Sequence, residues 1–245
     1  MGIRRGEITT KIVPHGLVFN MDAANRASYP KTGTTVTDTV SNNTGTLNGT
    51  TFSAETNGIF VFDGTDDYID NDNVLSQVLN NTNGTISSWI KLDDATPSSL
   101  QEIISFNDTT SNERIEVAIE VTTGQFRGYC YTAGSQRWWI KTDAAATTDD
   151  TWVNVTLTQN GSLAILYVNG VVVPQSTAGA QPNPGYWFSN SSLLDNVRIG
   201  CRNINNGGNT RFINGNIANT HIYNRALSAS EVLHNYNALK GRFGL

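Results

Sequence analysis

Five aspartates gather in the segment FDGTDDYIDND, between positions 63 and 72. Carboxylates and the backbone carbonyls of a glycine turn are oxygen ligands that suit Ca²⁺, although this spacing does not match an EF-hand loop. The same side chains could instead accept hydrogen bonds from the backbone of their own turn. The sequence thus offers calcium as a cofactor, with Asp63 and Asp66 as the favoured metal ligands, and local turn hydrogen bonds as the alternative.

Aromatic residues and an arginine alternate in the segment GQFRGYCYT. In a regular strand, Arg127, Tyr129 and Tyr131 share one face. If QRWWIKT is the hairpin partner, one of Trp138 and Trp139 joins them and the other enters the core. Flat rings beside an arginine suit a sugar, but they also suit a protein interface or ordinary cross-strand packing. We predict these five residues as ligand-binding and leave the three alternatives open.

Glu116 and Glu120 in EVAIE are the candidates for acid–base catalysis. Retaining glycoside hydrolysis needs two carboxyl groups about 5 Å apart, one of them held protonated by its surroundings. These two are separated by about 13 Å of extended backbone, and the alternative is that both are solvated strand carboxylates. No metalloprotease HExxH, nucleophile elbow, P-loop or dinucleotide fingerprint occurs in the sequence. We therefore predict that the protein is not an enzyme.

Short strands must position these residues. From His15 onward, apolar runs alternate with turn clusters about every 8–20 residues, as in an antiparallel sandwich. In WVNVTLT, residues 153, 155 and 157 are predicted to face the core and residues 152, 154, 156 and 158 the solvent. Asn160-Gly161 and Asn169-Gly170 have the composition of two-residue hairpin turns, which predicts three consecutive strands in one meander.

One helix is predicted, over residues 229–240 of RALSASEVLHNYNALKG. Ser228 and Glu231 form a capping box, an apolar stripe follows, and Gly241 provides the stop. We expect this helix to pack across the edge or end of the sandwich. The fold class is therefore all-β: a two-sheet antiparallel sandwich with one short C-terminal helix.

Charge and cysteine usage exclude several function classes. A net charge of −5 argues against nucleic-acid partners. No run of about 18 apolar residues suits a membrane span, and the N-terminus lacks the apolar core of a signal peptide. Cys130 and Cys201 are expected to be buried free thiols.

The order of motifs resembles the laminin G-like branch of the concanavalin A-like jelly rolls. FDGTDDYID, TISSWIKLD, TWVNVTLTQNGSLAILYVNG, VRIG and FINGNIANTHIYNRALSASEV carry the resemblance, from about residue 16 to residue 239. It implies two packed sheets with a concave outer face that commonly binds sugars or proteins, sometimes with calcium. Ala218 and Asn219 stand where that family often has an acidic residue, which removes one metal ligand. Glucanases of this fold carry Glu, Asp and Glu at alternate positions of one strand, but Ala118 stands in the middle here.

The termini GLVFNMDAANRASYP and ALKGRFGL are similar to versions of this domain in virion proteins of tailed bacteriophages. We therefore expect a non-enzymatic recognition or structural module of a virion, assembled in the host cytoplasm: a capsid decoration, fibre or tail-attached protein with glycan binding as an option. Residues 1–15 would be a docking arm, with Arg4, Arg5 and Lys11 meeting other virion proteins, and residues 16–245 the jelly-roll domain. Copies are expected to self-associate. The alternatives are a stand-alone calcium-assisted lectin and a glycoside hydrolase.

Overall fold

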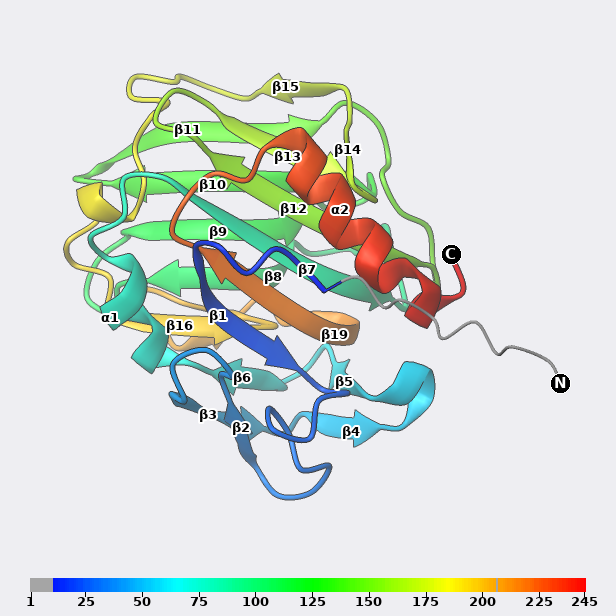
Figure 1. Ribbon diagram of the computed structural model, residues 1–245. Coiled ribbons are helices and arrows are strands. Elements are labelled where there is room, and N and C mark those ends of the chain that lie inside the picture. The colour runs from blue at the N-terminus through cyan, green and yellow to red at the C-terminus, as the bar shows by residue number, and fades with distance from the viewer. Residues whose placement is uncertain (1–10, 206) are drawn as a thin grey trace, which may run out of the picture.

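The computed structural model describes residues 11–205 and 207–245, which form two antiparallel sheets packed face to face (Figure 1). The predicted class, an all-β sandwich with a short C-terminal helix, is confirmed. Arg4 and Arg5 of the predicted arm lie outside the described residues.

Sheet A joins eight strands in the described part of the chain. Seven follow one another in the order β14 (Val171–Val172), β13 (Ala164–Val168), β12 (Trp152–Gln159), β7 (Gly84–Leu92), β19 (Asn214–Tyr223), β5 (Ile59–Asp63) and β4 (Thr51–Ser53). Strand β1 (Leu17–Asp22) pairs with the C-terminal half of β19, and β5 pairs with its N-terminal half.

Sheet B joins nine strands among the described residues. Their order is β15 (Gln175–Thr177), β11 (Ser135–Thr142), β10 (Phe126–Thr132), β9 (Arg114–Ile119), β8 (Gln101–Asn107), β16 (Asn196–Ile199), β6 (Tyr68–Asp70), β3 (Thr44–Asn48) and β2 (Thr35–Thr37). A small separate hairpin pairs β17 (Arg202–Asn203) with β18 (Asn209–Thr210).

The helices are α1 (Leu75–Val78) and α2 (Ala229–Leu239), with 3₁₀ turns at Glu55–Asn57, Asp72–Val74, Phe188–Asn190 and Lys240–Phe243. The sequence predicts only α2 among these. Neither α-helix has the length and hydropathy of a membrane-spanning segment in the part of the chain that the structure describes.

The core lies between the two sheets and follows the alternation of the strands. Val153, Val155 and Leu157 of β12 point into it as predicted. The opposite face of β12 was expected to be wet, and this is wrong, because residues 152, 154, 156 and 158 are all buried. Helix α2 lies across this outer face of sheet A (Figure 1), where Trp152 packs with Phe243 at 4.7 Å between ring centroids. The expectation that the helix packs at the edge or end of the sandwich is therefore wrong as well.

The predicted meander β12–β13–β14 is confirmed, and its two turns differ. Asn169 and Gly170 form a two-residue turn with φ values of 51° and 83°, the left-handed conformation that this dipeptide tolerates. The first connection is longer, since β12 ends at Gln159 and β13 begins at Ala164.

Helix α2 begins at the predicted capping box. The Ser228 side chain accepts a hydrogen bond from the Glu231 backbone N–H, and the Glu231 carboxylate accepts one from the Ser228 N–H at 2.9 Å. Arg225 donates to the same carboxylate at 2.6 Å, and this hydrogen bond is the main reason why the pKa of Glu231 falls to about 2. The cap and the arginine together fix where the helix starts.

The segment that begins at Lys11 runs along α2. The backbone N–H of Val13 donates to the Asn235 side chain at 2.8 Å, and the backbone oxygen of Lys11 lies 2.8 Å from the His234 ring nitrogen Nε2. The last residues of the predicted arm therefore pack on the chain's own helix, while the Lys11 side chain is exposed. A docking role for residues 1–15 stays a prediction.

Both cysteines are buried free thiols, as predicted. Burial raises the pKa of Cys130 and that of Cys201, the latter to about 12. Neither thiol is therefore poised for nucleophilic chemistry.

Candidate functional site

The outer face of sheet B brings together four of the five residues predicted to bind a ligand. Strand β10 places Arg127, Tyr129 and Tyr131 there, and Trp139 of β11 pairs directly with Tyr129. Trp138 points the other way: it is fully buried in the core, and its Nε1–H donates to the Tyr186 carbonyl at 2.7 Å. Trp138 therefore cannot contact a ligand on this face.

Arginines and aromatic rings alternate across the face. The Arg114 guanidinium lies 4.8 Å from the ring centroids of both Tyr129 and Tyr131, and Arg127 lies 5.1 Å from Tyr129 and 5.8 Å from Trp139. Tyr129 is only 8% exposed, and both guanidinium groups lie against its ring. The half-buried Tyr131 and Trp139 are the rings that a ligand can reach.

Beneath these rings, Glu116 is the centre of an ion-pair network. Arg127 donates to its Oε2 at 2.6 Å, and Arg114 and Arg202 approach its Oε1 at 3.3 Å and 3.5 Å. Arg211 lies 3.8 Å from Oε2. Burial would raise the pKa of Glu116, but the surrounding arginines, Arg127 first, hold it below its ordinary value. Glu116 is therefore a buried anion that organises four cations.

Glu102 of β8 adds a second buried carboxylate to this network. Its Oε1 accepts a hydrogen bond from Arg211 at 2.9 Å. Burial and the nearby charge of Glu116 raise its pKa to about 7. The network joins four arginines to three carboxylates, those of Glu102, Glu116 and Glu120, so positive charge is in excess. The side chain of Arg211 is 28% exposed and presents this charge to solvent.

Sequence reasoning missed Glu102, Arg114, Arg202 and Arg211. They come from β8, β9, the β17 hairpin and the segment after β18, so no local spacing connects them. A usable local signal was Arg114 two positions before Glu116 on one strand, which places both side chains on one face.

A polar pocket of about 400 Å³ adjoins the face at Tyr131. Its wall is formed by the loop before β9, the end of β10 and the turn after it, the segment before β16 and the β17–β18 connection: Thr110, Ser111, Asn112, Glu113, Tyr131, Ala133, Gly134, Leu193 and Asn205. Hydroxyl, amide and aromatic groups therefore border the same space, and the volume is in the range of small-molecule sites.

The aspartate loop after β5 brings three carboxylates together. One oxygen each of Asp63, Asp66 and Asp67 lies within 4.8 Å of the others, so Asp67 of the predicted acidic loop joins the two favoured ligands. Asp63 also accepts a hydrogen bond from the Thr65 backbone at 2.8 Å, and Asp67 accepts one from the Asp63 N–H at 2.9 Å. The turn hydrogen bonds of the alternative are therefore present. A hard cation would take the remaining oxygens of Asp63 and Asp66.

The sequence matches one protein-family model over residues 63–233, and that family is the concanavalin A-like lectin/glucanase superfamily. The chain belongs to this superfamily. No curated protein matches the sequence significantly.

Solved structures with the same fold include both sugar-binding and toxin domains. The CBM40 domain of the Ruminococcus gnavus IT-sialidase, bound to α2,3-sialyllactose, is 17% identical with a TM-score of 0.58, over 71% of this chain and 92% of that chain. The receptor-binding domain of a botulinum neurotoxin C/D mosaic is 15% identical with a TM-score of 0.64, over 91% and 51%. The NanB sialidase of Streptococcus pneumoniae is 18% identical with a TM-score of 0.58, over 71% of this chain and only 27% of that one.

The superfamily includes glucanases, and Glu116 and Glu120 are the candidate catalytic pair of this chain. Both carboxylates approach Arg127, Glu116 at 2.6 Å and Glu120 at 3.8 Å. Glu116 is 0% exposed, so the alternative of a solvated carboxylate is wrong for this residue. Its oxygens are occupied by arginines, which is the geometry of a structural ion pair.

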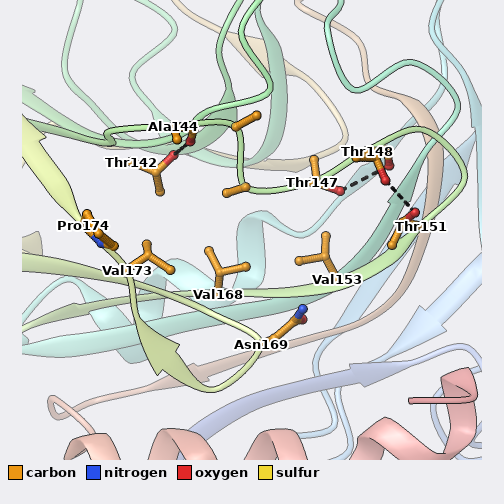
Figure 2. Close-up of a pocket in the computed structure, with 12 residues that line it drawn as sticks. Thr142, Ala144, Thr147, Thr148, Thr151, Val153, Val168, Asn169, Val173 and Pro174 are labelled. Carbon is orange, nitrogen blue, oxygen red and sulfur yellow. Dashed lines mark hydrogen bonds between the residues drawn. The ribbon is translucent and has the colours of Figure 1, made fainter.

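A second cavity, of about 440 Å³, lies between the loop after β11, strands β12 and β13, and the segment that follows β14 (Figure 2). Val153, Val168, Val173 and three consecutive alanines give it an apolar wall. The Thr148 and Thr151 hydroxyls hydrogen-bond each other at 2.8 Å, so they are already paired. The outer face of sheet B has more of the polar groups that would orient a sugar than this cavity has.

Proposed function

We propose that the protein is a non-enzymatic glycan-binding module and that its ligand lies on the outer face of sheet B. The observation that carries the proposal is the alternation of Arg114 and Arg127 with the half-buried rings of Tyr131 and Trp139 beside a polar pocket. Rings pack on the apolar face of a sugar, and polar groups bind its hydroxyls.

The charge of the face favours an acidic sugar, one that bears a carboxylate or sulfate. Burial lowers the pKa of Arg202, and the nearby positive charge of Arg211 lowers it further. An anionic ligand would relieve this repulsion and accept from arginine, whose planar donors match a carboxylate. The structural similarity to a domain bound to sialyllactose supports the same proposal.

Calorimetric titration with matched glycans tests this function. We expect sialylated or sulfated oligosaccharides to bind, and their uncharged counterparts to bind at least about tenfold more weakly, the loss of roughly one charged contact. Arg211→Ala and Trp139→Ala should both weaken binding by about tenfold or more, because one removes a charge and the other a ring that a ligand can reach.

Arg26→Ala is the matched control, since Arg26 is an exposed arginine on the loop between β1 and β2, and β2 is the edge strand of sheet B farthest from β10 and β11. Glycan binding that is equally strong in Arg211→Ala and Trp139→Ala would contradict the proposed site. Binding that requires Ca²⁺ and is lost on chelation would favour the calcium-assisted lectin, with Asp63 and Asp66 as its ligands. Release of reducing sugar that is lost in Glu116→Gln would favour an enzyme.

A virion is the setting that we propose for this module, as an accessory protein that meets other virion proteins and further copies of itself. It is supported by the similarity of the terminal segments to phage proteins. Removing residues 1–10 leaves the contacts of Lys11 and Val13 with α2 in place. We expect this shortened chain to fold normally but to lose incorporation into particles. Unchanged incorporation would contradict a docking role for Arg4 and Arg5.

A further inference from the structure

A cavity of about 630 Å³ lies between the C-terminal end of α2 and the β1–β19 pair. These elements belong to the side of the sandwich opposite sheet B (Figure 1). One wall is apolar, from Leu17 of β1, Leu239 of α2 and Pro14. The other is polar, from Asn20, Asp22, Asn25 and His221. The volume suits one or two sugar rings.

His221 is the most unusual group in this wall. It is only 4% exposed, and no hydrogen bond joins either of its ring nitrogens to a described residue. Burial lowers its pKa to about 4. The ring is therefore neutral near pH 7, with one nitrogen that donates and one that accepts. Buried polar groups are nearly always paired, and a ligand or water in the cavity can pair with this ring.

The neighbours of His221 also have unused hydrogen-bonding capacity. Asn219 and His221 pair directly with Asp22 and Asn20 across the two strands, and residues that face each other in this way point to the same side of a sheet. Asn219 is 0% exposed, and both of its amide atoms lack a partner. The Asn20 side-chain oxygen is buried without a partner as well. Donors and acceptors thus converge beside the cavity.

The charges around the cavity are balanced. Arg242 pairs with Asp22 at 2.8 Å, which neutralises the carboxylate on this wall. The Lys11 side chain lies at the rim and is exposed. A charged ligand would gain little from this arrangement, whereas a neutral ligand with several hydroxyls could use the amides and the imidazole, and its C–H groups could pack on the apolar wall.

We propose that this cavity binds a neutral sugar, through hydrogen bonds to His221, Asn20 and Asn25. The site is independent of the acidic-sugar site on sheet B, because the two lie on opposite faces of the sandwich. The protein would then hold two different glycans at once, one on each side.

NMR spectra of the histidine ring nitrogens test the proposal in the full chain, with methyl glycosides of glucose, galactose, mannose and N-acetylglucosamine as probes. We expect at least one probe to shift the His221 signals saturably and to leave those of the exposed His15 unchanged. His221→Phe should weaken binding of that probe by about tenfold, as expected for lost hydrogen bonds. Asn20→Leu is a second variant, in case the first fails to fold.

Arg211→Ala separates the two sites, because it should leave this binding intact. If none of the four probes shifts His221, the cavity holds only water and the proposal is wrong. If the shifts occur but disappear in Arg211→Ala, the sugar sits on sheet B and the proposal is wrong as well. Failure of acidic glycans to bind would leave the His221 result unaffected and would count only against the function proposed for sheet B.

Discussion

Replacing Glu116 with glutamine is expected to lower the free energy of unfolding by about 3–5 kcal/mol, the cost of breaking a buried ion pair from one side. Its carboxylate is fully buried and lies between Arg114, Arg127, Arg202 and Arg211. Without the negative charge, these arginines would repel one another while partly desolvated. Urea denaturation of the two proteins measures the difference. A loss below about 1 kcal/mol would mean that solvent or another anion already compensates the arginines.

Glu102→Gln is the matched control on the neighbouring strand. The folded-state pKa of Glu102 is about 7, above its ordinary value of 4.5. A carboxyl raised in this way stabilises the fold below the unfolded pKa and loses that contribution as the pH rises through the folded pKa. We therefore expect the stability of Glu102→Gln relative to wild type to increase between about pH 4.5 and about pH 7. At neutral pH this variant should be far less destabilised than Glu116→Gln.

Trp89→Ala is expected to cost about 3–5 kcal/mol, as for other buried tryptophans. Trp89 is 1% exposed on the outer face of sheet A. Phe243 stacks on it at 4.1 Å between centroids, and Tyr236 of α2 stacks on it at 5.5 Å. The truncation removes the ring on which both Phe243 and Tyr236 stack. The C-terminal segment should therefore become sensitive to proteases at lower urea concentrations than the rest of the chain.

Leu233→Ala is the control for this second prediction. Leu233 lies on the same helix but is 40% exposed, so its truncation should change the free energy of unfolding by less than about 1 kcal/mol. Equal effects of the two substitutions would show that the Trp89 stacking does not hold α2 in place.

Alternation and turn chemistry were enough to predict most of the sandwich. The strands around Val153 and Asn169 follow local rules, and the capping box at Ser228 fixes the start of α2. The position of α2 could not be predicted in this way. The residues that it covers, such as Asn154 and Thr156, are small and polar, and they hydrogen-bond among themselves at 3.1 Å. In the sequence, these residues have the pattern of a solvent-exposed face.

The site on sheet B was predictable only in part, because its rings are local and its charges are not. Alternation along β10 places Arg127 and Tyr129 together, and the hairpin pairing adds Trp139. Arg202 and Arg211 reach Glu116 from positions more than eighty residues away in the chain. Only the three-dimensional pairing of β8, β9 and β16 brings them there, so the sequence shows scattered charges where the structure has one network.

The placement of α2 also determines how the protein can be immobilised. Lys11 lies against this helix through its backbone, and the chain ends at Leu245, close to the end of the same helix (Figure 1). A biotin, fluorophore or resin coupled at the C-terminus would therefore be held behind sheet A. The arginine-rich side would then point away from the support, whereas coupling through Lys141 on β11 would turn that side toward it.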